Sequence, residues 1–566
     1  MRNLNLIKQS FAGGQYDESM SVRNDVAGFE SAAFELKNVV GLPRGGVEQR
    51  GGLRFLAKTG ASDERVKLVT FKFNTEQKYV IVFYPLHAVV YHEDAQVADV
   101  AVPYTADDIR GLDCVQQLDT LIIACADRPP AKLMRRGSHA DWAYSVIEFQ
   151  NAPTYEFDAG TKEAAWSEAR GYPACVCFHE GRLYFGGTKS LPNTVWGSKT
   201  NSPFDFNKTT DLLDDEGVEA TLVGSRAVAT VRAISSCLGL FFFTTEGPYA
   251  LTKSTITPKT FLPARYGAIP SGTVRGVEVE GATLFLSADD GRLKPSLNEF
   301  IWNDDDSRFE TNDLNIRCYG ILNSPVDCAC RQGNETDAAN HVFVVNGDGT
   351  AAVLNLKRAQ NMVGWTTMET RGKLLSVAVL DADVYFAVKR GNAVYLEKSD
   401  RSSHLDNSVS LSADEPKTEW ELPDDFDGRT VAVVADGAAL GDVVVRGGKI
   451  ALEYPAREIE AGYVFDVSVV PMPPAAEDVS LVNERWCLVC LRLMLENTAG
   501  CKVNGREIVV PRFGTDVFNP KASVVTGWVA ARSVGWVDEQ TQRPVVISTT
   551  SDKRITLHAL SMEVAC

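Results

Sequence analysis

Three pairs of closely spaced cysteines are the first residues that could do chemistry, because thiolates bind zinc. The pairs are Cys175/Cys177, Cys328/Cys330 and Cys487/Cys490. Structural zinc sites need four ligands, commonly two Cys-x-x-Cys pairs in register, and only Cys487-Leu-Val-Cys490 has that spacing. That pair lies in an apolar run, and residues three apart on a strand point to opposite faces. We therefore expect core thiols, with no metal and no other cofactor.

Hydrolysis is the second candidate chemistry. Ser287-Ala-Asp-Asp-Gly291 resembles the start of the Asp-box of sialidase propellers, but Arg292 stands where that box has an aromatic residue. The chain has no Gly-x-Ser-x-Gly elbow, phosphate loop or His-Glu-x-x-His motif, and its seven histidines are scattered. We assign no catalytic residue and expect no enzyme. A glycosidase needs only two suitably placed carboxylates, and the 74 acidic residues leave that alternative open.

The charge balance narrows the function further. The chain of 566 residues has 57 basic and 74 acidic side chains, a net charge of −17. This charge argues against a protein that coats nucleic acid or an anionic membrane, since both need a positive surface. No apolar run reaches the roughly 18 residues of a membrane span. The first residues lack the apolar region of a signal peptide, so we expect folding in a cytoplasm.

Glycine-punctuated strands are the elements that must position any site. Between about residues 66 and 400, short apolar runs are separated by turns with almost no helical periodicity. The turns are Glu180-Gly181, Glu246-Gly247, Asp290-Gly291, Asp348-Gly349 and Arg390-Gly391. X-Gly between apolar runs is a strong hairpin signal. The runs recur every 33 to 64 residues or so, a range that includes the 40–50 residues of a propeller blade. We predict an all-β fold with a β-propeller of six to eight irregular blades; a pair of β-sandwiches is the alternative.

Segments on both sides of the propeller complete the expected organisation. We assign 1–55 to an N-terminal docking segment, 56–400 to the propeller, 401–475 to a small β domain and 476–566 to a C-terminal β region. Residues 25–40 have apolar side chains at helical spacing, which predicts one amphipathic helix. Residues 41–54 hold five glycines and three arginines, a positive patch that calls for a partner. The C-terminal region has the size of a separate sandwich or of strands that close the propeller.

An ordered set of motifs resembles the tail nozzle (tail tubular or stabilisation) proteins of short-tailed bacteriophages, over essentially the whole chain. The motifs are Phe11-Ala-Gly-Gly14, Arg23-Asn-Asp25, Asn38, Pro43 to Phe55, Gly171-Tyr-Pro173, Phe178 to Gly187, Pro192-Asn193, Trp196-Gly-Ser198, Asn346 to Thr350, Trp365, Gly372 and Tyr395-Leu-Glu397. The chain departs from the family at Gln15-Tyr-Asp-Glu-Ser, where Glu-Val-Ser-Pro is usual, and at Lys37.

The resemblance implies a structural virion protein, assembled in the host bacterial cytoplasm and located in the virion tail. Its copies would form a homohexameric distal nozzle that docks to adaptor or head-tail connector proteins, near tail fibres or spikes. Phage DNA would pass through it transiently. Two alternative functions are a glycan-binding or glycan-cleaving propeller, tailspike-like or sialidase-like, and a monomeric receptor-binding propeller.

Two groups of residues are candidates for that role. Contacts with the adaptor or a neighbouring subunit are expected from Phe11, Gly13, Gly14, Arg44, Gly45, Gly46, Arg50 and Arg54, since arginines pair bidentately with carboxylates. A wall that DNA does not stick to should be acidic, because each basic contact adds affinity for DNA. The wall candidates are Asp214, Asp215, Glu216, Asp304, Asp305 and Asp306.

Overall fold

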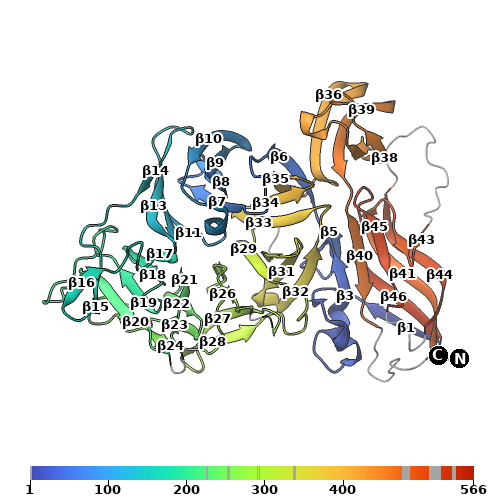
Figure 1. Cartoon of the computed structure of the whole chain (residues 1–566). Coiled ribbons are helices and arrows are strands. Elements are labelled where there is room, and N and C mark those ends of the chain that lie inside the picture. Colours follow the sequence, from blue (N-terminus) through green and yellow to red (C-terminus); the bar gives the residue numbers. More distant parts are fainter. Residues whose placement is uncertain are drawn as a thin grey trace.

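The computed structural model describes residues 3–224, 227–251, 255–289, 291, 293–334, 339–473, 485–508, 524–537 and 543–565. Strands make up most of this chain (Figure 1). The helices of the described residues are one turn of α-helix, α1 (Ala106–Ile109), and four 3-10 turns, η1 (Glu18–Val22), η2 (Phe29–Ser31), η3 (Arg358–Gln360) and η4 (Asp424–Phe426). None of the described helices is long and apolar enough to cross a membrane.

Seven four-stranded antiparallel units form a propeller. Blade 1 contains β7 (Lys67–Lys72), β8 (Lys78–Tyr84), β9 (His87–His92) and β10 (Ala95–Ala101). Blade 2 contains β11 (Asp113–Gln117), β12 (Thr120–Cys125), β13 (Arg128–Arg135) and β14 (Trp142–Val146). Blade 3 contains β17 (Cys175–His179), β18 (Arg182–Gly186), β19 (Thr194–Gly197) and β20 (Val218–Thr221). A separate hairpin of β15 (Thr154–Asp158) and β16 (Thr161–Ala164) projects between blades 2 and 3.

The remaining blades follow in chain order. Blade 4 contains β21 (Val231–Ser236), β22 (Leu240–Thr244), β23 (Gly247–Ala250) and β24 (Ala264–Arg265). Blade 5 contains β25 (Val277–Val279), β26 (Ala282–Leu286), β27 (Leu297–Asn303) and β28 (Arg308–Asp313). Blade 6 contains β29 (Pro325–Arg331), β30 (Asn340–Asn346), β31 (Ala351–Lys357) and β32 (Met362–Met368). Blade 7 contains β33 (Lys373–Leu380), β34 (Asp383–Arg390), β35 (Ala393–Asp400) and β6 (Gly52–Lys58).

The first strand of each blade lies nearest the axis, and blade 7 contacts blade 1 through β33 and β7, which closes the ring. The fourth strand of blade 7 comes from the N-terminal part of the chain: β6 pairs antiparallel with β35, with Lys58 opposite Tyr395. One blade therefore combines strands from both ends of the propeller sequence, which holds the ring shut.

A buried cluster of side chains fills each of the seven gaps between neighbouring blades. Between blades 2 and 3, for example, Trp166 packs edge-on against Phe185 and Phe206, with ring centroids 5.4 and 5.1 Å apart. A small sheet has two faces to bury, and radial stacking buries both. These separate clusters are the reason that the strands form a propeller and not the pair of sandwiches that the sequence also allowed.

The expected hairpin turns are confirmed where the structure describes them. Glu180 and Gly181 both have positive φ, 44° and 74°, as a primed turn requires. Leu118 (φ 51°) starts the turn between β11 and β12, and the apolar run 233–244 is divided between β21 and β22. Asp290 and Arg292, which belong to the predicted turn and Asp-box, lie outside the described residues.

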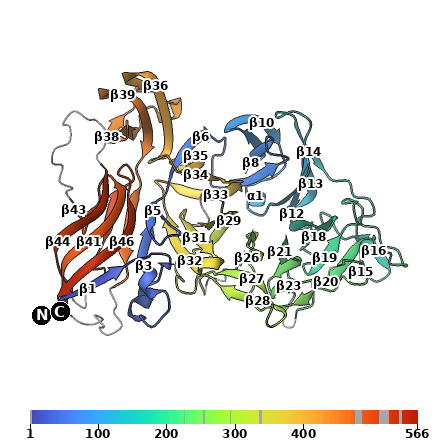
Figure 2. The ribbon, with the colours of Figure 1, turned by 180° about the vertical axis from the view of Figure 1, so that it is seen from behind.

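The predicted helix over 25–40 is wrong. Its second half is strand β3 (Ala32–Lys37), which pairs parallel with β32 of blade 6 and antiparallel with β40 (Asp466–Pro471). The neighbouring N-terminal strands also enter larger sheets. They are β1 (Asn3–Lys8), β2 (Gly14–Gln15), β4 (Val39–Gly41) and β5 (Val47–Gln49). Residues 1–55 therefore link the propeller to the C-terminal region (Figure 2).

The small β domain extends the sheet of blade 7 beyond β6. Its strands are β36 (Asp406–Glu421), β37 (Thr430–Ala435), β38 (Ala438–Val444) and β39 (Lys449–Tyr463). The C-terminal region is a sandwich of two layers around one core. One layer is a sheet of β1, β4, β5, β41 (Trp486–Thr498), β44 (Val525–Val537) and β46 (Thr556–Ala565). The other layer includes β40, β42 (Lys502–Val503), β43 (Arg506–Glu507) and β45 (Ile547–Thr550). The expected boundary at 475/476 lies outside the described residues.

Candidate functional site at the junction of propeller and sandwich

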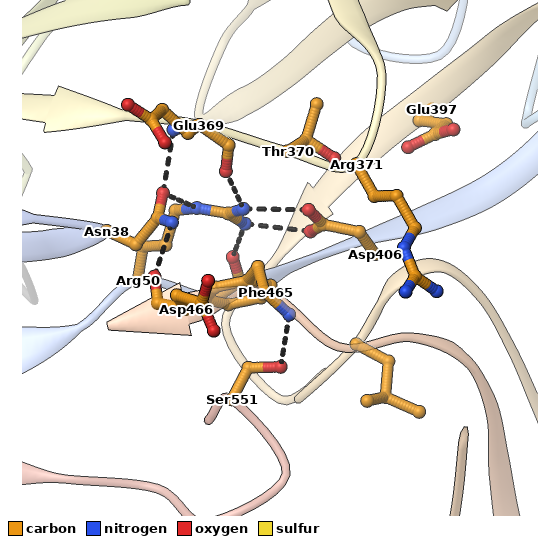
Figure 3. A network of polar contacts seen from close by, with 12 residues as sticks. Asn38, Arg50, Glu369, Thr370, Arg371, Glu397, Asp406, Phe465, Asp466 and Ser551 are labelled. Carbon is orange, nitrogen blue, oxygen red and sulfur yellow. Dashed lines mark hydrogen bonds and ion pairs between the residues drawn. The ribbon is translucent and has the colours of Figure 1, made fainter. Parts of the chain in front are cut away.

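Arg50 lies where the N-terminal segment, blade 7, the small β domain and the sandwich meet (Figure 3). Its guanidinium donates to both carboxylate oxygens of Asp406 at 2.8 Å, and the two side chains are only 7% and 1% exposed. The guanidinium also lies 3.6 Å from the ring centroid of Phe465. A bidentate ion pair stacked on an aromatic ring uses the planar shape of arginine, which lysine would not reproduce.

Asn38 completes this network from the other side. Its backbone is left-handed (φ 55°), a conformation that asparagine tolerates better than most residues. Its Oδ1 accepts hydrogen bonds from Arg50 Nε at 2.9 Å and from the Glu369 amide at 2.8 Å, while its Nδ2 donates to the Asp466 carbonyl at 2.7 Å. The side chains of Asn38 and Arg50 thus connect the N-terminal segment to residues 369, 406 and 466.

The glycines of the N-terminal motifs allow close backbone contacts. Gly14 has φ 73°, and a Cβ there would lie 2.2 Å from the Trp365 amide nitrogen of blade 6. Phe11 is 1% exposed in the sandwich core, and its amide donates to the carbonyl of Gly45 at 2.6 Å. A Cβ on Gly46 would lie 2.9 Å from the carbonyl oxygen of Leu557. These motif residues contact their own chain.

The structure thus corrects the expectation of an intermolecular role for Phe11, Gly14, Gly45, Gly46 and Arg50, all of which are buried. Arg54 forms an ion pair with Asp94 and is 37% exposed, whereas Arg44 is exposed and Gly13 is partly exposed. A contact with another protein stays a prediction for these three. Asn38 is one of the motif residues on which the resemblance depends, but the sequence assigned it no role, and Asp406 was not singled out because a lone aspartate carries no motif.

The acidic wall candidates lie on outer parts of the blades. Asp214, Asp215 and Glu216 precede β20, and the buried Arg182 holds this loop by donating to the carbonyls of Asp214 and Glu216 at 2.8 and 2.5 Å. Hydrogen bonds from Thr209 lower the pKa of Glu216 below its ordinary value. Asp215 pairs with Lys199 at 3.0 Å. Asp304, Asp305 and Asp306 are exposed in the turn between β27 and β28. Glu216 is only 2% exposed and its carboxylate accepts from the amides of its own loop, so the expectation of a wall residue is wrong for Glu216; for the other five it stays a prediction.

The propeller axis holds a cavity of about 500 Å³ lined by β7, β11, β29, β33 and the residues around β25. Arg275 of blade 5 reaches Asp113 of blade 2 at 2.9 Å, and Asp113 also accepts a hydrogen bond from the Val176 amide of blade 3 at 2.8 Å. Such a volume suits a small molecule. Because the Arg275–Asp113 pair bridges blades 5 and 2 at this cavity, the axis of the propeller is not an open channel.

Five cysteines line the innermost strands of the propeller: Cys114, Cys175, Cys177, Cys328 and Cys330. Burial raises the pKa of the Cys114, Cys177 and Cys330 thiols to about 12, so they are protonated at neutral pH. Cys487 and Cys490 lie on β41 on either side of a register shift. Among the described residues, no group of three or more His, Cys, Asp and Glu side chains could hold a metal ion.

One cluster contains the residue types of a hydrolase. Ser403 Oγ donates to Glu460 Oε1 at 2.5 Å, and His404 Nδ1 lies 3.2 Å from Glu460 Oε2. Nucleophilic catalysis needs the hydroxyl to be bonded to its base, whereas here the hydroxyl and the imidazole each bond to the carboxylate. Glu460 also accepts hydrogen bonds from the amides of His404 and Leu405. The cluster orders a bend between blade 7 and the small β domain.

Lys8 gives the junction a pH-dependent stability. It is buried beside Phe11, and its Nζ donates to the carbonyl of Glu30. Burial lowers its pKa from 10.5 to about 7, against the opposing charge of Glu30. Between pH 7 and 10.5 the unfolded chain therefore binds a proton that the folded chain lacks, so the Lys8 contribution to the free energy of unfolding rises with pH across this window.

The variant Lys8→Met should remove this contribution. We expect the free energy of unfolding, measured by urea denaturation between pH 7 and 9.5, to rise less steeply with pH in the variant than in the wild type. Lys162→Met, at an exposed lysine, should keep the wild-type slope. Equal slopes for wild type and Lys8→Met would show that Lys8 is charged in the folded chain.

The fold and the site define an all-β protein, a seven-bladed propeller with appended β modules.

No family model and no curated protein matches the sequence. Among solved structures, BBS1N in complex with ARL6DN is similar at 10% identity and a TM-score of 0.38, with 62% of this chain and 99% of that chain covered. The WD40 repeats of RRP9 give 10% identity and a TM-score of 0.37, covering 62% and 100%. BamB from Moraxella catarrhalis gives 12% and 0.30, covering 63% and 92%. These scores are low, so the fold class rests on the sheet order and the inter-blade cores.

Proposed function

We propose that this chain is a structural subunit of the tail of a short-tailed bacteriophage. Copies of it form a hexameric distal nozzle, which docks to the adaptor proteins, lies near the attachment of fibres or spikes, and lets DNA leave the particle. The observation that carries the proposal is the junction: the N-terminal motifs on which the resemblance depends join propeller and sandwich through the Arg50–Asp406 pair.

The charge of the chain agrees with this role. Six copies at −17 each would carry 6 × −17 = −102 formal charges, which keeps a polyanion from adhering to the passage. Because the Arg275–Asp113 pair bridges blades 5 and 2 at the axial cavity, the proposed passage for DNA would lie between copies rather than along the axis of one propeller. A glycan-binding or glycan-cleaving propeller is the second candidate, because the axial cavity has the volume of a small-molecule site.

Imaging separates the two candidates. For a nozzle subunit we expect negative-stain images of purified virions, labelled with an antibody against this chain, to place it in a ring at the distal tail around a central passage. Incubation of the purified chain with bacterial polysaccharide should release no reducing sugar. A chain that labels only outward-pointing appendages, or that releases sugar, contradicts the proposal.

A further inference from the structure

The cavity on the propeller axis has a mostly apolar lining with a few charged side chains. Its volume is about 500 Å³, and its walls are the innermost strands of blades 1, 2, 6 and 7 and the residues around β25. The charged residues of the lining are three cations and two carboxylates: Lys67, Arg110, Arg275, Asp113 and Asp327. A cavity of this size with a few polar groups is typical of a small-molecule site. The donors and acceptors that these groups leave unused therefore indicate the chemistry of a ligand.

Both carboxylates of the lining have partners within the chain. Asp113 Oδ1 accepts a hydrogen bond from Arg275 at 2.9 Å, and its Oδ2 accepts one from a backbone amide of blade 3 at 2.8 Å. Asp327 accepts hydrogen bonds from the Ser376 hydroxyl and from two backbone amides, at 3.0 and 3.1 Å. Glu278 is close enough to Arg275 for their charges to interact, but it lies outside the lining and forms no hydrogen bond with Arg275. Each carboxylate oxygen of the lining therefore has a donor, and neither group requires a cation from solution.

Within the described chain, Arg275 uses only one of its three guanidinium nitrogens. Nη1 donates to Asp113 and to two backbone carbonyls, at 2.8 and 3.4 Å. Nε and Nη2 have no acceptor among the described residues, and 35% of the side chain is accessible. Nε and Nη2 form the edge of a guanidinium that can hold a carboxylate by two parallel bonds, as Arg390 holds Glu397 at 2.6 and 2.7 Å. The same edge of Arg275 can hold an anion in the cavity.

Two further cations line the same cavity. Lys67 Nζ donates to the Leu112 carbonyl at 2.6 Å, which occupies one of its three N–H groups. Burial raises the pKa of the Cys114 thiol, and the charges of Lys67 and Arg275 both oppose this rise, so the two cations lie near the same part of the cavity. Arg110 is exposed, and its guanidinium forms no hydrogen bond or ion pair with another described residue. The lining thus has unused donors of positive charge, whereas its carboxylates are already bonded.

We propose that the axial cavity binds a small organic anion through a carboxylate or phosphate group. The Nε–Nη2 edge of Arg275 holds that group by two parallel bonds, and Lys67 and Arg110 add positive charge beside it. The apolar part of the lining packs against the rest of the ligand. A cavity lined by charges of one sign attracts the opposite sign even in a chain with a net charge of −17. The inference goes beyond the proposed function, because the cavity lies inside one propeller and does not depend on assembly.

Calorimetric titration of the full-length chain tests this site. Inorganic phosphate and citrate are the probes, because they carry the two candidate groups, and glucose is the uncharged control. We expect at least one of the two anions to bind at one site per chain, and glucose to give no heat of binding. The anion that binds more tightly identifies the group that the site prefers. Arg275→Gln and Lys67→Gln should each weaken the binding about tenfold or more, the effect of losing a hydrogen bond to a charged group.

Two more variants keep the test decisive if Arg275→Gln, which leaves Asp113 without its cation, does not fold. Arg110→Gln changes a side chain without a partner in the described chain, so it should fold and bind the anion more weakly. Arg136→Gln, at an exposed position of blade 2 outside the cavity, is the matched control and should bind like the wild type. Thermal unfolding midpoints show which variants are folded.

Three results would overturn the inference: no binding of either anion, unchanged binding by both Lys67→Gln and Arg110→Gln, or an equal loss in Arg136→Gln. Binding of glucose in place of the anions would also overturn it, and would favour the glycan-binding candidate. Labelling of virions tests the nozzle separately, so the inference and the proposed function can fail independently.

Discussion

Replacing Asp406 with asparagine is expected to lower the free energy of unfolding by about 3–5 kcal/mol, the cost of leaving a buried charge without its partner. Arg50 would keep its contacts to Asn38 and Phe465 and one bond to the amide oxygen of the new side chain, but it would lose the other bond and the negative charge that balances its own. Chemical denaturation followed by tryptophan fluorescence measures the change. Asp25→Asn is the matched control, because Asp25 forms an exposed pair with Arg23 at 2.8 Å, and exposed pairs contribute little.

The double variant Arg50→Met/Asp406→Leu separates the pair from its surroundings. Replacing both partners of a buried ion pair with apolar side chains is often close to neutral, so we expect this chain to be more stable than Asp406→Asn. A loss below about 1 kcal/mol for Asp406→Asn would mean that water reaches the site and that the pair does not hold the junction together.

Gly52→Ala is expected to weaken the closure of the propeller by about 1–3 kcal/mol, the usual cost of forcing an extra methyl group into a packed site. A Cβ at this position would lie 2.0 Å from the Leu405 carbonyl oxygen and 2.5 Å from Ser403 Oγ. The backbone must then move, and the bonds from the Gly52 and Leu53 amides to residues 403 and 405 are lost. Because β6 closes blade 7, the variant should unfold at lower denaturant and be cut sooner by protease between β6 and β7.

Gly111→Ala is the control for this variant. Its new Cβ would lie 3.6 Å from its nearest neighbour, the Asp108 carbonyl oxygen, which is an ordinary contact. We expect a denaturation midpoint equal to or slightly above that of the wild type, since alanine restricts the unfolded chain. If both alanine variants behave alike, close packing at Gly52 does not govern closure.

The propeller strands were predictable because their signals are local. An X-Gly pair between apolar runs, such as Glu180-Gly181, specifies a primed turn within a few residues. The blade count was not predictable, since loop lengths vary and the pairing of β6 with β35 joins residues more than 300 positions apart.

The helix predicted over 25–40 was wrong for another reason: Ala32, Ala33 and Leu36 are all fully buried because β3 has neighbours on both faces. Such a strand lacks alternation and is hard to distinguish from a helix.

At the candidate site, side-chain chemistry was predictable and its partners were not. The arginines of residues 41–54 were expected to pair with carboxylates, and Arg50 and Arg54 do so with Asp406 and Asp94. Sequence gives the charge of a side chain but not whether its partner lies in the same chain. Asp406 becomes part of the site only through the fold, which brings it 356 positions back to Arg50.

During translation, β6 is synthesised long before β35, the strand with which it pairs. Lys58 pairs with Tyr395, 337 residues later, and translation at about 5–20 residues per second needs roughly 17 to 70 seconds to cover that distance. Throughout this time the nascent chain carries an unmatched strand at its start. Polysomes that carry several such chains close together give each strand the chance to pair with the wrong molecule, so slower initiation of translation should raise the yield of correctly closed protein.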